Sequence, residues 1–528
     1  MLRTLSSWRV IALPLILCGA GVATPHPTAR RAPAHDHQAA VAVVRHGLDA
    51  IGGENAWHRV RTLELWSRGV QFHVGDSEWP EGPYALDYLT VHEWRDLAGL
   101  RRSERTASST MDTAAATSRR VTTLQGSTQY VTSGDTEVAV ASLSPDTLAL
   151  LLAPEHVLLA ALEAPDLRVE RDTVMRFVPH HVVSFRVAGH PARIFFEAET
   201  GFPRMVEVRR AFPTSVFWNA WGDVVERVRY TNWTREAGGI LYPRQIDTER
   251  NGVPLSSVSI GAVGVNAQVP AGRLDVVART TGGPPCGFSC QIADSLPLGV
   301  GGAGGTSATA ADRGGHEIAP GVVQIVGGWN VTLVRQPDGV VVIEAPISAG
   351  YSRRVIEEAA RRFPGLPVKA VVSTTDFWWH VAGLREYVAR GIPVYVLGRN
   401  VRVVRDRAAA PHTLFPDSLA RAPRDPIIRA VRGRTVLGSG DNRLELIPFH
   451  TEGLDRMMMV YLPGRRVLYT AEGVQLFGGR LWYPETAAEA MSAVRREGLV
   501  PESFIGMHVP RTPWTSLTTV LDSVARTN

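Results

Sequence analysis

The chain has 528 residues, of which 45% are hydrophobic and 20% are charged, a composition typical of globular proteins rather than disordered ones. A chain of this length can form two or three domains with sizeable cores. The formal net charge is only +5, and Lys369 is the only lysine, so arginine carries almost all of the positive charge. The sequence contains no basic run interleaved with aromatic residues, so nucleic acid is not a predicted partner.

The N-terminus has the pattern of a secretory signal peptide. Arg3 and Arg9 precede the apolar run at 10–17, and the small residues 21–23 offer a cleavage site. The run is shorter than the ~20 residues of a membrane helix, and no later run approaches that length. We predict that residues 1–23 are removed, with no transmembrane segment left, and that the product is exported to the periplasm or secreted. Cys18 is placed as a lipid-anchored cysteine would be, but the bulky residue before it makes a lipid anchor the less favoured alternative.

Two segments of unusual composition divide the rest of the chain. Residues 24–38 combine proline, alanine and histidine and are predicted to form a flexible leader. Residues 280–315 are rich in glycine, serine and alanine, cannot bury a core, and are predicted to be an interdomain linker. Cys286 and Cys290 lie in this linker. Their close spacing in an exported protein indicates a local disulfide, with two free thiols or a metal clip as alternatives.

The segment between these breaks, residues 39–279, is predicted to be a strand-rich domain. It opens with apolar residues at helical spacing over 40–53 and a helix end at Gly52 and Gly53. Period-two alternation then predicts strands, among them 182–189, 192–200, 203–211 and 223–233. Turn signals separate them at 199–201, 238–239 and 251–252. One helix followed by a long antiparallel sheet predicts an α+β domain shaped as a curved half-barrel.

Three stretches of this region carry a resemblance: "GLDAIGGENAWHRVRTLEL", "FFEAETGFPRMVEV" and "GGILYPRQIDTERNGV". They resemble bacterial periplasmic domains related to lipoprotein-localisation carriers, across residues 40–270. Those domains are half-barrels that hold acyl chains on a concave apolar face. The resemblance therefore implies an apolar ligand, and the alternative is a β-rich accessory domain that binds none.

The last segment, residues 316–528, alternates strands with helices, which indicates layered α/β structure. Ser352 is the predicted N-cap of a helix over 352–363, and a strand in "PVKAVVS" is followed by a helix that ends at Gly391. Later strands each have a polar or ionisable residue at or near their end; they are 443–450, 457–472 and 504–509.

The strand-end histidines and carboxylates of this segment resemble, in their order, the metallo-β-lactamase superfamily. The resemblance covers the whole C-terminal domain and implies an αββα sandwich with metals at one edge. In that family the ligands come from a loop motif H-x-H-x-D-H, a later His, a bridging Asp and a final His. His380 matches the last histidine of the loop motif, and His450, Glu472 and His508 match the later ligands in turn.

The loop "STTDFWWHVAGL" departs from the motif of the family. Thr375 and Phe377 stand at the positions of its first two histidines, and Trp379 stands at the position of its aspartate. A two-metal mechanism is therefore not expected. Asp376 lies one position after the first expected ligand and is a possible catalytic residue if a small shift of the loop turns it inward.

The ligands that remain suit one zinc ion per chain. His380, Glu472 and His508 form a His₂-carboxylate set of the kind that holds a catalytic zinc. By the resemblance, His450 belongs to the second metal. We predict an exported metal-dependent hydrolase with an atypical single-metal site, acting on a small ester, amide or lactone-like molecule.

The alternative is a non-catalytic periplasmic binding protein, related to lipid or lipoprotein handling, whose hydrolase domain has lost its metals. In that case the histidines are structural, and Phe377, Trp378 and Trp379 fill the former metal pocket.

Overall fold

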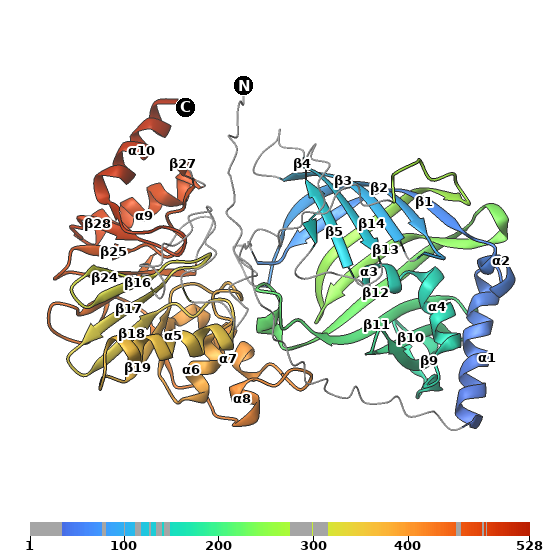
Figure 1. The fold of residues 1–528 in the computed structure, drawn as a ribbon, viewed down its shortest axis with the longest axis horizontal. Coiled ribbons are helices and arrows are strands. Elements are labelled where there is room, and N and C mark those ends of the chain that lie inside the picture. Colours follow the sequence, from blue (N-terminus) through green and yellow to red (C-terminus); the bar gives the residue numbers. More distant parts are fainter. Residues whose placement is uncertain are drawn as a thin grey trace, which may run out of the picture.

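The computed structural model describes residues 34–75, 81–99, 101–110, 118–125, 128–133, 140–141, 148–274, 298, 315–449, 456–477, 480–481 and 483–527. The predicted signal peptide and all but two residues of the predicted linker lie outside these residues, and so do Cys18, Cys286 and Cys290. The chain forms an N-terminal half, blue to green in Figure 1, and a C-terminal half, yellow to red. Within the described residues, no helix has both the length and the apolar character needed to cross a membrane.

The N-terminal half packs a few helices against one antiparallel sheet (Figure 1). The helices are α1 (Ala34–Ala50), α2 (Glu54–His58), α3 (Leu148–Leu151) and α4 (Pro154–Glu163). The strands are β1 (Thr62–His73), β2 (Ala85–Asp96), β3 (Arg101–Thr110), β4 (Ser118–Gln125), β5 (Thr128–Ser133), β6 (Val140–Ala141), β7 (Arg168–Val169), β8 (Thr173–Met175), β9 (Val178–Val187), β10 (His190–Glu197), β11 (Pro203–Ala211), β12 (Asp223–Arg235), β13 (Leu241–Arg250) and β14 (Val253–Val265). They are ordered β6-β5-β4-β3-β2-β1-β14-β13-β12-β11-β10-β9-β7, with β8 paired to β9. The predicted helix followed by an antiparallel sheet is confirmed.

Local sequence explains where the elements of this half begin and end. Helix α1 begins at Ala34, inside the segment predicted as a leader, because the alanine-rich run there favours a helix and Asp36 lies in its first turn. Gly52 and Gly53 follow the helix with φ of 116° and 90°, as expected for its end. Asn251 and Gly252 have φ of 50° and 83° and form the tight turn between β13 and β14.

One face of this sheet is covered by helices along part of its width. Leu48 of α1 and Leu158 of α4 are buried in one cluster with Ile194, Val206 and Tyr230 of the sheet. Strands β1 to β3 and β12 to β14 continue this face beyond the helices, where their side chains line a cavity instead.

The C-terminal half contains two larger sheets and six helices in its described part. The first sheet has the order β15 (His316–Ala319), β16 (Val322–Ile325), β17 (Val331–Gln336), β18 (Gly339–Ile343), β19 (Val368–Ser373), β20 (Val394–Leu397), β21 (Ile428–Val431). The second has the order β22 (Thr435–Leu437), β23 (Leu444–Phe449), β24 (Met457–Leu462), β25 (Val467–Tyr469), β28 (Ser503–Ile505), β29 (Thr512–Pro513), and β26 (Leu476–Phe477) pairs with β27 (Arg480–Leu481). The helices are α5 (Ala349–Arg362), α6 (Leu384–Ala389), α7 (Val401–Ala409), α8 (Ser418–Arg421), α9 (Pro484–Arg496) and α10 (Trp514–Thr527).

Period-two alternation on β18 divides the packing of the first sheet between two cores. Val341 and Ile343 join the buried cluster that contains the second sheet, together with side chains of α9. Val340 and Val342 join a different cluster, which contains the buried faces of α5 and α6. The first sheet therefore has a second sheet on one face and helices on the other, and the predicted α/β class of this half is confirmed.

The N-cap of α5 is Ser348, and the prediction of Ser352 was wrong. The Oγ atom of Ser348 accepts a hydrogen bond from the backbone N–H of Tyr351 at 3.0 Å, and Ser348 itself has extended backbone angles. Ser352 lies inside the helix and is buried. The Ala-Gly pair after Ser348 is a weak helix signal, so the sequence pattern pointed to the later serine.

The two halves contact each other directly, at the turn η1 (Asn219–Trp221) and the start of β12. The Nδ2 group of Asn219 donates to the carbonyl oxygen of Ile347 at 2.6 Å. The carboxylate of Asp223 accepts from the hydroxyl of Thr413 at 2.6 Å and from the backbone N–H of Leu414 at 2.9 Å. The sequence indicated two domains joined by a linker and gave no signal for this interface.

Trp378 of the C-terminal half packs against two tryptophans of the N-terminal half. The ring centroid of Trp378 lies 5.8 Å from that of Trp218 and 5.3 Å from that of Trp221. Trp378 therefore packs toward the other half of the molecule, whereas the alternative interpretation placed it in a former metal pocket. Phe377 and Trp379 lie beside His380, with centroid separations of 5.4 and 5.9 Å.

Candidate metal centre

Two neighbouring strands bring Glu472 and His508 to the same edge of the second sheet. Strands β25 and β28 are parallel, and Tyr469 lies opposite Ile505 at their carboxyl ends. Each candidate ligand lies three residues beyond its strand, in the loop that follows. Because the carboxyl ends of parallel strands meet at one edge, the two side chains reach the same place.

The third candidate, His380, reaches this edge from the first sheet. It lies in the loop between β19 and α6. A backbone hydrogen bond of 3.0 Å from Met458 N to Thr374 O ties the start of this loop to β24 in the second sheet. The loop therefore crosses between the two sheets at the edge where Glu472 and His508 lie.

The side chains of His380, Glu472 and His508 converge on one oxygen atom. Glu472 Oε1 lies 3.0 Å from His380 Nε2 and 3.1 Å from His508 Nε2. The possible ligand atoms of the three residues all lie within 4.8 Å of one another, and no other such group of His, Cys, Asp and Glu occurs in the part of the chain that is described. His380 and Glu472 are buried, and His508 is nearly so. The structure therefore brings together three of the four predicted ligands.

Each of these three side chains also has a hydrogen-bonding partner outside the group. Thr375 Oγ1 lies 2.9 Å from His380 Nδ1, and His508 Nδ1 lies 2.8 Å from the carbonyl oxygen of Gly328. Gln475 Nε2 donates to Glu472 Oε2. Partners of this kind fix the orientation of metal-binding histidines and carboxylates in known metal sites.

The bond to Gly328 decides which nitrogen of His508 faces the carboxylate. A carbonyl oxygen only accepts, so Nδ1 carries the hydrogen, and Nε2 of the neutral ring presents a lone pair. That lone pair faces Glu472 Oε1, a second acceptor, at 3.1 Å. Two acceptors at this distance require a positive charge between them, either a proton or a metal ion. Two imidazole nitrogens and a carboxylate oxygen are ligands that zinc accepts, so the site fits one zinc ion.

Without a metal, a proton takes that role. Burial alone would raise the pKa of Glu472, but the charges of His508 and His380 and their hydrogen bonds outweigh it and hold the pKa below its usual range. Burial lowers the pKa of His508, but the charge and hydrogen bond of Glu472 outweigh it, so the pKa is raised. At pH values below the raised pKa of His508, metal binding therefore displaces a proton from its ring.

The other two predicted site residues are His450 and Asp376, and neither is seen in this group. His450 lies outside the described residues. Asp376 does not join the three ligands: its Oδ2 atom lies 3.8 Å from Arg456 Nη1. Burial raises the pKa of Asp376 to about 7, although the charge of Arg456 opposes the rise. The loop shift that would turn Asp376 toward the ligands is not present.

Sequence reasoning missed the residues that hold the ligands. Thr375 was interpreted only as a lost histidine, yet its hydroxyl contacts His380. The sequence offered one signal for this contact: Thr375 lies five residues before His380 in the same loop. Gln475 lies three residues after Glu472 and offered a similar signal, whereas nothing in the sequence pointed to the carbonyl group of Gly328.

Glu344 is a further buried carboxyl group near the site that the sequence did not reveal. It is fully buried after β18 with a φ of 77°, a left-handed conformation that is strained for this residue. Thr374 donates to its Oε1 atom through both its backbone N–H and its hydroxyl. Burial raises the pKa of Glu344 to about 8, helped by the charge of Glu472 and opposed by the bonds from Thr374. Glu344 is therefore mostly protonated at neutral pH.

Replacing Glu344 by glutamine is expected to increase stability at pH 8 and to have little effect near pH 4.5. The unfolded carboxyl group ionises near 4.5 and the folded one near 8, so stability falls as pH rises between these values. A neutral amide removes this loss, which amounts to about 1.4 kcal/mol per pKa unit. Urea unfolding of Glu344→Gln and the native chain at several pH values measures it, and parallel curves for the two proteins would contradict the raised pKa.

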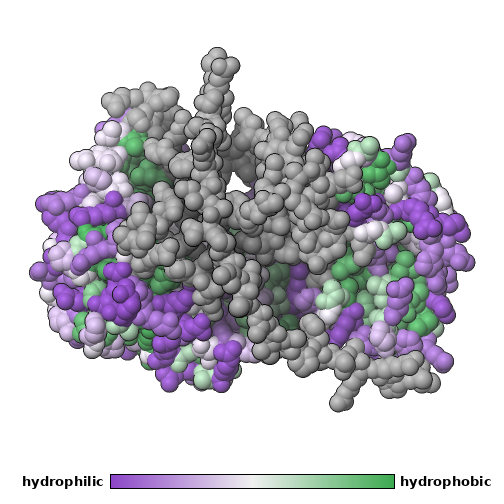
Figure 2. Space-filling view, in the orientation of Figure 1, coloured by the Kyte–Doolittle hydropathy of each residue, from purple (hydrophilic) through white to green (hydrophobic). Residues whose placement is uncertain are grey.

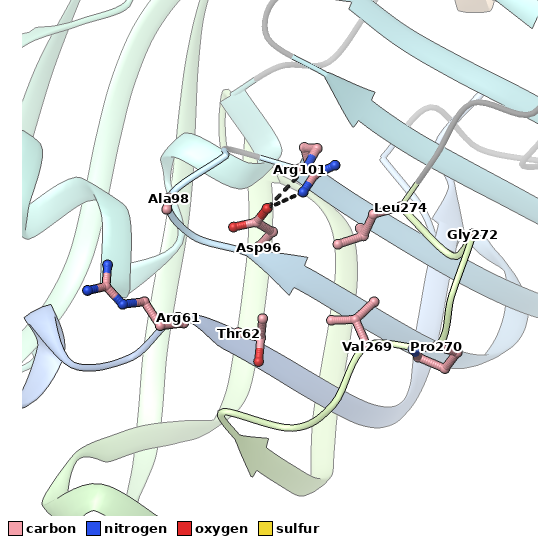
Figure 3. A pocket seen from close by; sticks show the side chains of 9 residues that line it. All are labelled: Arg61, Thr62, Asp96, Ala98, Arg101, Val269, Pro270, Gly272 and Leu274. Atoms are coloured by element: carbon pink, nitrogen blue, oxygen red, sulfur yellow. Dashed lines mark hydrogen bonds and ion pairs between the residues drawn. The ribbon is translucent and has the colours of Figure 1, made fainter.

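A second cavity, of about 400 Å³, lies at the end of β2 (Figure 3). Asp96 lies in its wall and accepts hydrogen bonds from Arg101 Nη2 at 2.6 Å and from the backbone N–H of Gly99 at 3.0 Å. Burial raises the pKa of Asp96, but these bonds outweigh it and keep the group ionised. The lining contains neither histidine nor a second carboxyl group among the described residues, so we do not regard it as a catalytic site.

Comparisons with known proteins give a limited likeness. No family model matches the chain, and no curated protein sequence matches it. The chain is similar to the inverting sec-alkylsulfatase Pisa1 from Pseudomonas sp., at 17% identity and a TM-score of 0.30, over 40% of this chain and 41% of that one. It is also similar to a metallo-β-lactamase from Pontibacter korlensis, at 16% identity and a TM-score of 0.31, over 39% of this chain and 98% of that one.

A metallo-β-lactamase from Erythrobacter litoralis gives 13% identity and a TM-score of 0.32, over 40% of this chain and 96% of that one. The match spans about two fifths of the alkylsulfatase but nearly all of the two lactamases. A likeness at this level does not identify the function.

Proposed function

We propose that this protein is a hydrolase of the metallo-β-lactamase type that holds one zinc ion with His380, Glu472 and His508. The substrate class is an ester, amide or lactone-like compound. The observation that carries the proposal is the approach of His380 Nε2 and His508 Nε2 to Glu472 Oε1, at 3.0 and 3.1 Å, with a separate partner at each Nδ1. A purely structural ion pair would need neither the second histidine nor these oriented rings.

When bound, zinc supplies Lewis-acid chemistry: it polarises a substrate oxygen and makes water more acidic. The residues of the chain orient the ligands and limit access. Thr375 and Gly328 hold the two imidazole rings, and Gln475 holds the carboxylate. Trp329 is buried beside both histidines, with ring centroids 6.2 and 6.3 Å away, and excludes bulk water on that side.

The surroundings of His380 support one metal rather than two. Phe377 and Trp379 place aromatic rings beside it where the family has metal ligands. Within the described residues, no further His, Cys, Asp or Glu joins the three ligands.

We also propose that the C-terminal half is an αββα sandwich and that the protein is exported. The shared core of the two sheets, with helices packed on the first sheet, supports an αββα sandwich. The signal-like segment 1–23 supports export to the periplasm or beyond.

Hydrolysis of p-nitrophenyl acetate should be detectable with zinc, abolished by a chelator and restored by added zinc. Thr375→Val should lower zinc affinity or activity about 10- to 100-fold, because loss of the partner of a ligand histidine usually has that effect. Thr519→Val, an exposed threonine on α10, serves as the matched control. If the native chain neither binds zinc nor cleaves the ester, the non-catalytic binding protein becomes the better reading.

A further inference from the structure

The N-terminal sheet has a second face, opposite to the one that lines its cavity, and this face carries a stack of three rings. Trp66 of β1 lies on His92 of β2, with ring centroids 3.3 Å apart and ring planes at 20° to each other. The ring of His92 lies 3.6 Å from that of Trp94, also on β2. The neighbouring residues Leu65 and Val91 line the cavity, so the alternation of side chains along a strand places the stack on the opposite face.

One end of the stack is open to solvent. Trp66 is 48% exposed, and Tyr88, further along the same face of β2, is 56% exposed. Hydrophilic residues cover most of the described surface in Figure 2, so these two large rings lie on a mainly polar exterior. The other end is covered, because Trp94 is buried and the guanidinium group of Arg273 lies 4.5 Å from its ring centroid. The stack therefore offers an aromatic surface at its Trp66 end.

A row of polar side chains crosses the sheet beside the stack. Arg68 of β1 lies opposite Ser259 of β14 on one side and Thr90 of β2 on the other. Ser259 Oγ donates to Gln245 Oε1 at 2.6 Å, and Gln245 Nε2 donates to Ser257 Oγ at 2.8 Å. Hydroxyl and amide groups both donate and accept hydrogen bonds. The row can therefore bind the hydroxyl groups of a ligand that rests on the aromatic surface.

Positive charge is in excess on this face. Arg68, Arg105 and Arg273 form no ion pair with any carboxylate among the described residues. Glu64 and Asp247 lie on the same face, and each already accepts hydrogen bonds from neighbouring side chains. A guanidinium group binds a carboxylate through two parallel hydrogen bonds. The face is therefore complementary to a ligand that carries carboxylates.

The position of these strands in the sheet favours a sugar chain over a peptide strand. Strands β1 and β2 are each paired on both sides, so they have no free edge to which a peptide strand could add. A sugar ring offers a face of C–H groups that packs on an aromatic ring, and hydroxyl groups that bond to polar side chains. From Trp94 to Tyr88 the face extends for about 20 Å, because a strand rises about 3.4 Å per residue. Several linked sugar rings fit along it.

We propose that this face of β1, β2, β3 and β14 binds an acidic oligosaccharide, a chain of sugar rings that carry carboxylates. A sugar ring packs on Trp66, the polar row bonds to hydroxyl groups, and Arg68 and Arg105 pair with carboxylates. The site uses no residue of the metal centre, so binding should be the same with and without a chelator. The failure of the hydrolase proposal would leave this inference standing.

Calorimetry on the full chain tests the site with hexagalacturonate, which is acidic, and maltohexaose, a neutral chain with the same number of rings. Trp66→Ala removes the exposed ring, and Arg68→Gln removes one charge. Tyr88→Ala changes the aromatic surface independently if the first variant fails to fold. Two variants distant from this face serve as matched controls. They are Phe177→Ala, at an exposed turn between β8 and β9, and Arg402→Gln, with a side chain on α7 that is 78% exposed.

The native chain should bind hexagalacturonate about tenfold more tightly than maltohexaose, because bonds between charged groups are stronger than neutral ones. This difference should shrink as sodium chloride is added, since salt screens exposed charges. Trp66→Ala should weaken the binding of both sugars, and Arg68→Gln that of hexagalacturonate alone. Both controls should bind as the native chain does.

Three results would overturn the inference: no binding of hexagalacturonate by the native chain, equal affinity for the two sugars, or equal affinity of the native chain and Trp66→Ala. Light scattering tests a different occupant, a second copy of the chain. A dimer that forms with the native chain and not with Trp66→Ala would mean that this face is a self-association surface, and would also overturn the inference.

Discussion

Zinc is expected to raise the melting temperature of the native chain, and His508→Ala is expected to abolish that rise. A ligand that binds only the folded state stabilises it by about 2.7 kcal/mol when its free concentration is 100 times Kd. Removal of His508 leaves two ligands, one fewer than catalytic zinc sites use. His58→Ala is the control, because His58 is an exposed histidine of α2 far from the candidate ligands in the chain.

The zinc effect should be larger at pH 8 than at pH 6. In the metal-free protein, the raised pKa of His508 adds stability that is complete below 6.5 and is lost as pH rises through the raised value. The lowered pKa of Glu472 adds stability above 4.5 that is lost as pH falls through the lowered value. Protons therefore compete with zinc most strongly at the lower pH. An equal rise in the native chain and His508→Ala would place the zinc elsewhere, and no rise in either would favour the non-catalytic reading.

Arg95→Leu should destabilise the N-terminal half by about 3–5 kcal/mol, because it removes the cation that pairs with the buried carboxylate of Glu155 and leaves Glu93 with Arg102 alone. The guanidinium group of Arg95 bonds to Glu93 at 2.6 Å, to Glu155 at 2.5 Å and to Tyr242 Oη at 3.0 Å. All of these groups are buried. The midpoint of urea unfolding, followed by circular dichroism, measures the loss.

Arg101→Leu is the matched control for this network. Arg101 also pairs with a carboxylate, that of Asp96, but its side chain is 36% exposed. Partly exposed ion pairs contribute about 0–1 kcal/mol, so this variant should unfold close to the native chain. Similar midpoints for both variants would mean that the network around Arg95 contributes no more than a surface pair.

The sequence predicted the classes of both halves because their patterns are local. Alternation over 182–189 and 203–211 sufficed for strands β9 and β11, and the positive-φ turn at 251–252 was visible from its residues. The start of α1 and the N-cap of α5 were missed by a few residues, since weak terminal signals such as Ala-Gly do not fix a helix end. The docking of the two halves depends on contacts between residues far apart in the chain, such as Asp223 with Thr413, which no local pattern reveals.

The candidate site was predictable to the extent that its ligands follow strands. Glu472 and His508 lie three residues beyond the ends of β25 and β28, whose parallel pairing brings them together, and His380 lies in the loop that follows β19. The supports of these ligands were not predictable: a backbone carbonyl such as that of Gly328 has no signature in a sequence. Asp376 was a possible catalytic residue because of its closeness in the loop; its carboxylate lies beside Arg456 and outside the group of three ligands, and its role stays a prediction.

The contact between Trp378 and the tryptophans of the N-terminal half has a consequence for engineering. This residue belongs to the loop in which Thr375, Phe377 and Trp379 stand at positions where the motif H-x-H-x-D-H has metal ligands. Restoring those ligands would remove the ring of Trp379 from the cavity wall and from its contact with Phe217. Placing metal ligands at these positions would therefore cost the contact of Trp379 with Phe217, one of those that join the two halves, while Trp378 would keep its contacts with Trp218 and Trp221.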